Sequence, residues 1–455
     1  MWHNVILPLQ IQQATNSLYI SRMSDLQNLY QLYLKHPILS TDTRNISEGC
    51  IFFALKGEHF NANTFAEQAL QLGAAYVVID EEAFQLDERC ILVSDVLQTL
   101  QGLARYHRLQ LSIPVIGLTG SNGKTTTKEL LKAVLSEKLK TFATKGNLNN
   151  HIGVPLSILA INAETEIAVI EMGANHQHEI EFLCTIAQPT HGLITNIGMA
   201  HLDGFGGFEG VKKGKAELYA YLKQNEGTVF VYCDNPYLLE MSAAASLNKV
   251  VYYGKDSENK VSGTLIKTDP YIEFNWTHAG ETYPAKANLT GAYNFENILA
   301  AICVGNFFGL NPTEINHGLA NYFPNNNRSQ LTKTAENTLI CDFYNANPSS
   351  MAAALTNISG LTATHKAAIL GDMFELGKET PEQHEVIVKM AEKAGLTVLI
   401  FIGKHFYAFK DQYEGLFFNT PAEAATYLTQ NPIKDSLILL KGSRGMALEQ
   451  LMPLL

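Results

Sequence analysis

Short apolar runs rich in β-branched residues alternate with stretches of helical spacing, about 10–15 residues long, along nearly the whole chain. The runs are continuously apolar, which is typical of strands buried on both faces of a parallel sheet. The expected strands cover residues 75–79, 115–118, 168–170, 193–197, 339–341, 367–370, 398–402 and 437–440. This pattern predicts an α/β protein built from βαβ units, and 455 residues are enough for about three domains.

Two joints divide the chain. A helical pattern between Asp95 and Pro114 leads into a new strand, and a polar, turn-forming cluster at 321–328 precedes a fresh α/β run. The apolar positions of that helical pattern are Leu97, Leu100, Leu103 and Tyr106. We therefore expect domains at 1–95, 96–323 and 324–455.

The composition excludes several classes of protein. Hydrophobic residues make up 46% and charged residues 17%, as in a globular protein with real cores. Acidic residues outnumber basic ones by 44 to 33, and this net charge of -11 argues against non-specific binding of nucleic acid or anionic lipid. A local basic pocket for a phosphorylated small molecule remains compatible with it.

Cysteine usage and the amino terminus bear on the compartment. The six cysteines occur singly, so thiolate metal sites and disulfide frameworks are not expected. Met1-Trp-His-Asn4 brings no basic segment before its apolar stretch, and no window approaches 18 uninterrupted apolar residues. The sequence thus predicts a cytoplasmic protein without a membrane span.

The segment Gly117-Leu-Thr-Gly-Ser-Asn-Gly-Lys-Thr-Thr-Thr127 has the character of a phosphate loop. A buried strand enters it and an amphipathic helix leaves it, so backbone N–H groups and the helix N-terminus can surround phosphate oxygens. Lys124 can reach the β- and γ-phosphates, and the Thr125 hydroxyl can ligate Mg²⁺. The usual first glycine is replaced by Leu118, and no Asn-Lys-x-Asp run supports guanine, so ATP is the expected nucleotide. The candidate ATP-binding residues here are Gly120, Ser121, Asn122, Gly123, Lys124, Thr125 and Thr126.

Two further expected strands end in candidate metal ligands. Glu171 follows one strand, and His201 comes shortly after the next. The carboxyl ends of neighbouring parallel strands converge, so a carboxylate and an imidazole could lie beside the phosphate loop. Mg²⁺ prefers oxygen, so Glu171 is the easier ligand and His201 the less usual one. Lys215 lies in what reads, from the residues alone, as a basic helix start.

Ordered motifs from residue 119 to residue 444 together resemble the Mur ligases, ATP-dependent amide-forming enzymes of peptidoglycan synthesis, a process tied to cell wall biogenesis, shape and division. They are Thr119-Gly-Ser-Asn-Gly-Lys-Thr-Thr126, Thr144-Lys-Gly-Asn-Leu-Asn-Asn-His-Ile-Gly-Val-Pro155, Glu171-Met-Gly-Ala174, Asn196-Ile-Gly-Met-Ala-His-Leu202, Gly291-Ala-Tyr-Asn-Phe-Glu-Asn297, Asn327-Arg328, Asp342-Phe-Tyr-Asn-Ala-Asn-Pro348 and Lys441-Gly-Ser-Arg444. The resemblance covers nearly the whole chain. It implies a central P-loop nucleotide-binding α/β sheet, flanked by an N-terminal UDP-substrate domain and a C-terminal Rossmann-like domain for the amine.

The resemblance also implies residue roles that spacing cannot show. Lys215 matches a lysine that is carbamylated and then helps to hold Mg²⁺ with Thr125, Glu171 and His201. The implied catalytic set is Lys124, Lys215, His201 and Glu171. Asn294 and Asn297 match residues around adenine, although helix capping is the usual work of Asn. Arg328 and Asp342 match groups that touch the nucleotide from the hinge and the last domain.

Within the family, three stretches most resemble the branch that joins D-alanyl-D-alanine to UDP-N-acetylmuramoyl-tripeptide. They are Asp342–Met351, Gly371-Asp-Met-Phe-Glu-Leu-Gly377, and Thr41-Asp-Thr-Arg44 with Phe52-Phe-Ala-Leu-Lys-Gly57. This implies ATP and Mg²⁺, an acyl-phosphate intermediate, two small-molecule substrates and a monomer that binds no nucleic acid. Candidate substrate contacts are Thr43 and Arg44 for the UDP end, Asn149 and Asn150 near the peptide, and Asn345, Asn347 and Arg444 for the dipeptide. Because water would hydrolyse an acyl phosphate, we expect the C-terminal domain to close about residues 321–328.

Several alternatives stay open from the sequence. Another ligase of the family could add the third peptide residue or act on folylpolyglutamate-type substrates, and profiling of amine substrates separates these. A small-molecule kinase could use the same phosphate loop, but it would form no amide. A nucleotide-gated binding protein would show no turnover for a Lys124→Ala substitution to remove.

Overall fold

The computed structural model describes residues 25–455, so the expectation drawn from Met1–Asn4 lies outside the described residues. The chain divides into two compact units. The described part of the first covers 25–113, 144–164 and 185–188, and the second covers 114–143, 165–184 and 189–455. Within residues 25–455, every helix is too short or too polar to span a bilayer.

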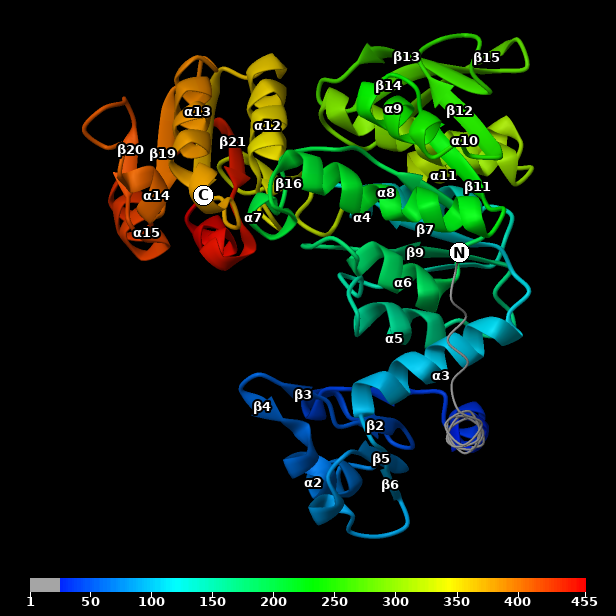
Figure 1. Ribbon diagram of the computed structural model, residues 1–455. Coiled ribbons are helices and arrows are strands. Elements are labelled where there is room, and N and C mark those ends of the chain that lie inside the picture. The colour runs from blue at the N-terminus through cyan, green and yellow to red at the C-terminus, as the bar shows by residue number, and fades with distance from the viewer. Residues whose placement is uncertain (1–24) are drawn as a thin grey trace, which may run out of the picture. The chain divides into compact units, whose positions relative to one another are not determined.

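The first unit is built on a small parallel sheet of order β1-β2-β5-β6 (Figure 1). The strands are β1 (Leu39–Ser40), β2 (Ile51–Phe53), β5 (Tyr76–Ile79) and β6 (Cys90–Leu92), with a hairpin of β3 (Lys56–Gly57) and β4 (Phe60–Asn61). Its helices are α2 (Ala66–Gln71), α3 (Val96–Gln110) and α5 (Gly153–Leu159), and residues 25–35 are also helical. Helix α3 packs on α5, and its buried His107 bonds to the Ile161 carbonyl oxygen at 2.9 Å.

The central part of the second unit is a nine-stranded sheet of order β15-β14-β13-β12-β11-β10-β7-β9-β8. From β8 to β13 all neighbours are parallel, and β14 and β15 extend the sheet as an antiparallel edge. The bounds are β7 (Val115–Thr119), β8 (Thr141–Ala143), β9 (Ile167–Glu171), β10 (His191–Ile194), β11 (Thr228–Tyr232), β12 (Lys249–Gly254), β13 (Val261–Lys267), β14 (Ile272–His278) and β15 (Glu281–Ala287). The helices are α4 (Lys124–Leu135), α6 (Glu179–Ala187), α7 (Leu202–Phe205), α8 (Phe208–Gln224), α9 (Pro236–Ala244), α10 (Phe295–Phe307) and α11 (Pro312–Asn321). Helices α4, α10 and α11 pack on one another.

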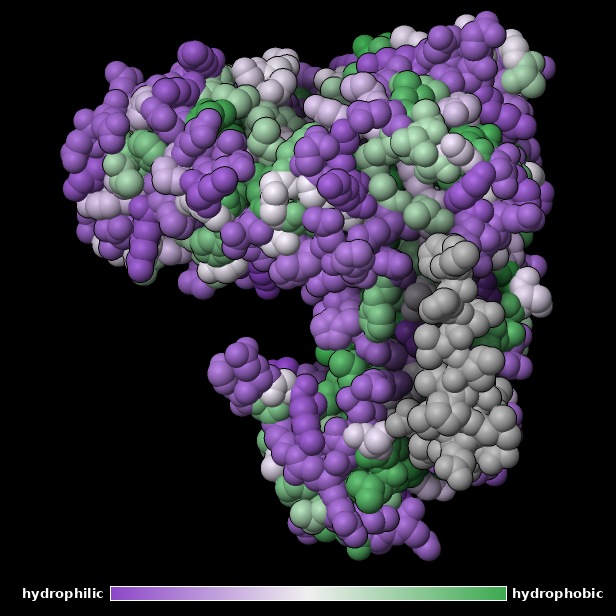
Figure 2. Space-filling model, in the orientation of Figure 1, coloured by the Kyte–Doolittle hydropathy of each residue, from purple (hydrophilic) through white to green (hydrophobic). Residues whose placement is uncertain are grey.

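The C-terminal part carries a six-stranded sheet of order β16-β17-β21-β18-β19-β20, parallel except for β16. The strands are β16 (Gln330–Lys333), β17 (Thr338–Asp342), β18 (His365–Gly371), β19 (Val398–Ile402), β20 (Leu416–Phe418) and β21 (Ser436–Lys441). The helices are α12 (Pro348–Gly360), α13 (Thr380–Glu392), α14 (Lys404–Tyr407) and α15 (Pro421–Gln430), and 3-10 turns follow β21. Hydrophilic residues cover most of the face of this part that Figure 2 shows, so its apolar side chains lie mainly in the core.

Most expected strands coincide with observed strands to within two residues, namely with β5, β7, β9, β17, β18, β19 and β21. The amphipathic helix after the phosphate loop is α4, and its apolar face of Leu130, Leu131, Val134 and Leu135 is fully buried. The strand expected at 193–197 is wrong in its second half, since β10 ends at Ile194. Beyond Ile194 the side chains of Thr195 and Asn196 bind the phosphate loop: the Thr195 hydroxyl donates to the Asn122 carbonyl oxygen at 2.5 Å, and Oδ1 of Asn196 accepts the Asn122 N–H at 3.0 Å.

The domain boundaries expected from the sequence stay predictions. Residues 322–329, between α11 and β16, carry no helix or strand, which suits a hinge there. Helix α3, which we expected to open the central domain, belongs to the first compact unit.

Candidate active site

The phosphate loop lies between the end of β7 and the start of α4, and two of its glycines are required by close contacts. Gly120 has a φ of 144°, and a Cβ there would lie 2.0 Å from the Thr195 hydroxyl oxygen. Gly123 has a φ of 77°, and a Cβ there would lie 2.6 Å from Oδ1 of Asn297. Residues that carry a side chain rarely adopt such positive φ angles. Leu118 is a fully buried residue of β7, so the missing glycine falls in the strand, outside the loop.

Asn196 fixes the loop from the neighbouring strand end. Its carbonyl oxygen accepts the Ser121 N–H and its Oδ1 accepts the Asn122 N–H, both at 3.0 Å. Its amide Nδ2 donates to Glu296 at 2.8 Å, and burial raises the pKa of that carboxyl to about 7. Asn196 was not among the expected site residues, although it stands in a quoted motif, because the expected strand at 193–197 included it.

Lys124 is the cation of the loop. Its Nζ donates to the Gly120 carbonyl oxygen at 2.7 Å and to that of Ser121 at 3.1 Å. Burial lowers the pKa of Lys124 to about 8, with Glu171 opposing the shift and Arg328 adding to it. The charges of Glu171 and Arg328 therefore both act on the Lys124 amine.

Glu171 ends β9 and is almost fully buried. The Thr125 hydroxyl donates to its Oε1 at 3.3 Å, and Nζ of the buried Lys128 lies 3.7 Å from its Oε2. A hydroxyl beside a carboxylate is a set of hard oxygen donors, so Thr125 and Glu171 fit Mg²⁺. Lys128 was not predicted as a site residue from the sequence, because a lysine within a helix is normally exposed.

Lys215 lies in α8 and is 1% exposed. Its Nζ donates to the Ala174 carbonyl oxygen at 3.3 Å and lies 5.0 Å from the centre of the Phe205 ring. Burial lowers the pKa of Lys215 well below its ordinary value, Lys124 lowers it further, and Glu179 and Glu217 oppose. The environment thus favours the neutral amine.

His201 precedes α7 with a left-handed φ of 54°, and its ring pairs with the carboxylate of Glu375 from the C-terminal part. Among residues 25–455, no three or more His, Cys, Asp and Glu side chains are grouped as a metal site. Any ion at Glu171 would therefore complete its shell from Thr125, His201, a modified Lys215, the substrates or water.

Asn294 and Asn297 lie buried under the phosphate loop. The Asn294 side chain makes no capping hydrogen bond to α10 and instead donates to the Thr290 carbonyl oxygen at 2.8 Å. Asn297 donates to Asn294 at 3.1 Å and accepts from the Thr127 hydroxyl at 3.0 Å. The capping interpretation of Asn294 is therefore wrong, and Asn297 supports the Gly123 turn.

Arg328 lies in the segment between α11 and β16, between two left-handed residues, Asn327 and Ser329, with φ of 57° and 50°. Its guanidinium lies 3.9 Å from the centre of the Tyr344 ring. The Ser329 N–H donates to Asp342 at 3.2 Å, and Asp342 is also paired with Lys441 at 2.7 Å.

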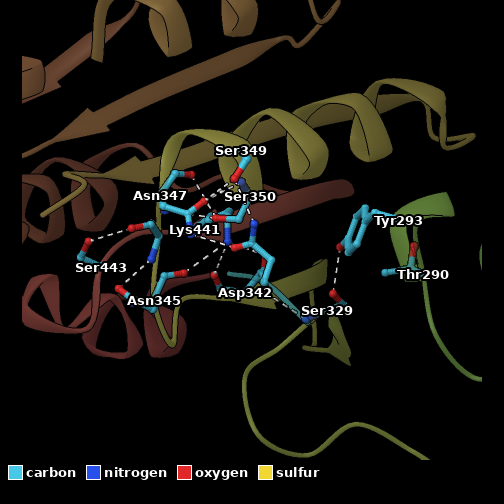
Figure 3. A network of polar contacts seen from close by, with 12 residues as sticks. Thr290, Tyr293, Ser329, Asp342, Asn345, Asn347, Ser349, Ser350, Lys441 and Ser443 are labelled. Atoms are coloured by element: carbon cyan, nitrogen blue, oxygen red, sulfur yellow. Dashed lines mark hydrogen bonds and ion pairs between the residues drawn. The ribbon is translucent and has the colours of Figure 1, made fainter. Parts of the chain in front are cut away.

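Figure 3 shows how the polar residues after β17 are arranged around Asp342 and Lys441. Asn345 is exposed and its Oδ1 accepts the Ala346 N–H at 2.9 Å. Asn347 caps α12, and its Nδ2 donates to Oδ1 of Asn122 at 2.7 Å. Arg444 is largely exposed and pairs with Glu449 at 3.1 Å. Of the three expected dipeptide contacts, only Asn347 is brought to the phosphate loop.

The remaining expected contacts lie in the first unit. Arg44 is exposed and paired with Asp42, which caps the short turn Thr43–Asn45. Oδ1 of Asn150 accepts the N–H groups of Ile152 and Gly153, so it starts α5, and Asn149 is the residue before it. Arg44 and Asn150 thus have a local structural explanation, and the substrate roles of all four residues stay predictions.

Comparison with known proteins gives consistent matches. The Mur ligase middle domain matches residues 118–305, and the Mur ligase, glutamate ligase domain matches residues 327–444. The UDP-N-acetylmuramoyl-tripeptide--D-alanyl-D-alanine ligase of Escherichia coli is 34% identical over 95% of this chain and 97% of its own length. A crystal structure of MurF from Acinetobacter baumannii aligns with a TM-score of 0.82 at 32% identity, covering 91% and 92% of the two chains. MurF ligase from Thermotoga maritima, solved in complex with ADP, aligns with a TM-score of 0.79 at 26% identity, covering 92% and 96%.

Proposed function

This chain belongs to the Mur ligase family, and from that premise we propose how its residues perform the reaction. It has the three-domain fold of these ligases and is an ATP-dependent ligase of peptidoglycan synthesis. It joins D-alanyl-D-alanine to UDP-N-acetylmuramoyl-tripeptide. The observation that carries the mechanism is the glycine loop itself, in which Lys124 bonds to the Gly120 and Ser121 carbonyl oxygens and Thr125 donates to the buried Glu171.

The chemical problem is an unreactive carboxylate. At neutral pH the terminal carboxylate of the tripeptide is an anion that amines do not attack. When it attacks the γ-phosphate of ATP, it becomes an acyl phosphate and ADP leaves. The amine of D-alanyl-D-alanine then adds to the carbonyl carbon, and phosphate departs from the tetrahedral intermediate. Positioning and electrostatics carry such a transfer, so no side-chain nucleophile is required.

The residues of the loop supply positive charge between two anions. Lys124 and Arg328 offset the repulsion between the carboxylate and the triphosphate. Thr125 and Glu171 would hold Mg²⁺, with His201 and Lys215 as further candidates, and the ion would neutralise charge on the phosphate oxygens. We assign the phosphate contacts to residues 120–126 and the adenine side to Asn294 and Asn297, with Asp342 facing the nucleotide from the last domain.

Lys215 is suited to become an anion. A neutral amine adds CO₂ to give a carbamate, and burial of Lys215 favours the neutral amine. The carbamate would supply an oxygen ligand where the unmodified chain offers only Glu171 and Thr125. Lys215 then acts in metal binding and no longer as a cation.

The other assignments follow the expected domains. We assign 1–95 to the UDP end through Thr43 and Arg44, 96–323 to ATP, and 324–455 to the dipeptide. Asn149 and Asn150 would face the muramoyl peptide, with Asn345, Asn347 and Arg444 near the dipeptide. We place the reaction in the cytoplasm, where nucleotide-linked precursors and ATP are available, and one chain supplies every assigned residue.

A complete assay tests the function. Purified protein with ATP, Mg²⁺, UDP-tripeptide and D-alanyl-D-alanine should release one ADP and one phosphate per new amide, identified by product mass. Lys124→Ala should lower turnover at least a hundredfold, because the transferred phosphate loses its positioned cation. ADP formed without a new amide would contradict the assignment, and phosphate transfer to a stable product would indicate a kinase.

A further inference from the structure

Three side chains form a closed ring of hydrogen bonds between the phosphate loop and the first turn of α12. Figure 3 shows two of them, Asn347 and Ser349, at the start of that helix. Nδ2 of Asn347 donates to Oδ1 of Asn122 at 2.7 Å. Nδ2 of Asn122 donates to the Ser349 hydroxyl oxygen at 2.9 Å. That hydroxyl donates in turn to Oδ1 of Asn347 at 2.9 Å. Each member therefore both gives and accepts a bond within the ring.

Asn122 is rigidly held on the side of the loop. Its backbone N–H donates to Asn196 at 3.0 Å, and its carbonyl oxygen accepts from Thr195 at 2.5 Å. The ring thus joins a fixed point of the phosphate loop to the C-terminal part, across 227 residues of sequence.

Gly198 packs closely against the ring of Asn122, Asn347 and Ser349. A Cβ at this position would lie 2.7 Å from the Ser349 hydroxyl oxygen and 3.1 Å from Nδ2 of Asn122. Gly198 is also bonded to the loop, since its N–H donates to the Ser121 hydroxyl at 2.9 Å. Only a residue without a side chain leaves room for the ring.

We infer that Asn122, Asn347 and Ser349 form an interdomain clamp, and that Ser349 is a positioning residue for the amine substrate. The clamp holds the start of α12 against the loop where the acyl phosphate forms, so that a dipeptide carried by the C-terminal domain meets it. This rests on the proposed function, which places the dipeptide on that domain. Ser349 touches no reacting atom in this account and acts through the placement of α12.

The neighbouring serine gives a matched control. The Ser350 hydroxyl bonds only to Asn347 backbone atoms at 3.1 Å among its described partners, and it belongs to the capping box of α12. Ser349→Ala and Ser350→Ala thus remove the same atom from adjacent positions, one in the clamp and one in the helix cap.

The experiment measures steady-state kinetics of amide formation and ADP affinity by calorimetry. Ser349→Ala should raise the KM for D-alanyl-D-alanine about three- to tenfold, the worth of one or two hydrogen bonds. Its ADP affinity and kcat should remain within twofold of wild type. Ser350→Ala should lower the melting temperature with the dipeptide KM unchanged, and Ser349→Thr should restore a KM near wild type.

Gly198→Ala supplies a second route if Ser349→Ala folds poorly. The added methyl group should raise the same KM, and the double variant Gly198→Ala/Ser349→Ala should be no worse than the worse single variant. Equal dipeptide KM values for Ser349→Ala, Ser350→Ala and wild type would overturn the clamp. A Ser349→Ala variant that loses ADP affinity while its dipeptide KM stays unchanged would overturn it too. Wild type forms the amide in the same assay, so this outcome is distinct from failure of the proposed function.

Discussion

Two lysine side chains beside the phosphate loop lie in environments that disfavour their charged form, since Lys215 is buried and Lys124 is half-buried. Burial lowers the pKa of Lys124 to about 8 and that of Lys215 well below its usual value. A lysine near its pKa exchanges its proton readily and responds strongly to a bound anion. A bound phosphate should favour the charged form of Lys124, and a neutral Lys215 amine is compatible with the carbamylation proposed above.

Nucleotide affinity should fall as the pH rises above about 8. Below that value the Lys124 ammonium is already present, whereas above it the free protein must take up a proton to bind phosphate with a charged lysine. The dissociation constant for ADP should therefore rise up to about tenfold per pH unit until the pKa of the complex is reached.

Calorimetry of ADP binding between pH 7 and pH 10 measures this dependence. Lys124→Arg stays charged throughout and should bind more weakly at pH 7 but with a flat profile. A wild-type affinity that does not change with pH, or an arginine variant with the wild-type slope, would contradict the role of Lys124.

At the scale of elements, two irregular segments lie near the phosphate loop. One is the early end of β10, and the other is the sharp turn around Arg328. Strand β10 stops at Ile194, so that Thr195 and Asn196 can bind the loop. The hinge carries left-handed residues on both sides of Arg328, and that side chain stacks on Tyr344 just after β17. Thr195, Asn196 and Arg328 thus all lie just outside a strand.

Tyr344 should matter for nucleotide use through Arg328. Tyr344→Leu removes the aromatic face and should raise the KM for ATP about fivefold, the effect expected of a cation–π contact of roughly 1 kcal/mol. Tyr344→Phe retains the ring and should remain within twofold of wild type. Steady-state kinetics with varied ATP would decide, and equal KM values for the leucine and phenylalanine variants would show that the ring does not position Arg328.

Local spacing made the loop, α4 and most buried strands predictable, because those signals lie within a dozen residues of one another. Asn196, Ser349 and Glu375 were not predicted, since their partners lie 74, 227 and 174 residues away in the sequence. The antiparallel strands β14 and β15 were not predicted either. Polar and apolar residues alternate along this hairpin at the edge of the sheet, so its sequence lacks the continuous apolar run of a buried strand. The roles of Lys215 and Arg328 were predicted from family resemblance. The burial of one side chain and the aromatic contact of the other depend on tertiary structure and cannot be deduced from residue spacing.

At the scale of the whole molecule, the reaction requires a phosphorylated intermediate to be shielded from water. The C-terminal part contacts the central part at several points, among them Tyr293 with Ser329 at 2.8 Å and Asn357 with Thr290 at 3.1 Å. Each of these bonds joins a residue that precedes the segment 321–328 to one that follows it. We expect them to form and break as substrates enter and products leave.

Small-angle scattering should therefore register closure. A non-hydrolysable ATP analogue together with UDP-tripeptide and D-alanyl-D-alanine should reduce the radius of gyration relative to the free protein. The analogue alone serves as the reference for nucleotide binding without a complete set of substrates. Identical profiles in all three conditions would argue against a hinge at 321–328.

The central claim is that phosphate is handed to the terminal carboxylate of the peptide, and isotope transfer tests it most directly. UDP-tripeptide carrying ¹⁸O in that carboxylate is turned over with unlabelled ATP and D-alanyl-D-alanine, and the released phosphate is examined by mass spectrometry. The account predicts one ¹⁸O atom in each phosphate and one in the new amide carbonyl. Unlabelled phosphate alongside normal amide formation would contradict it.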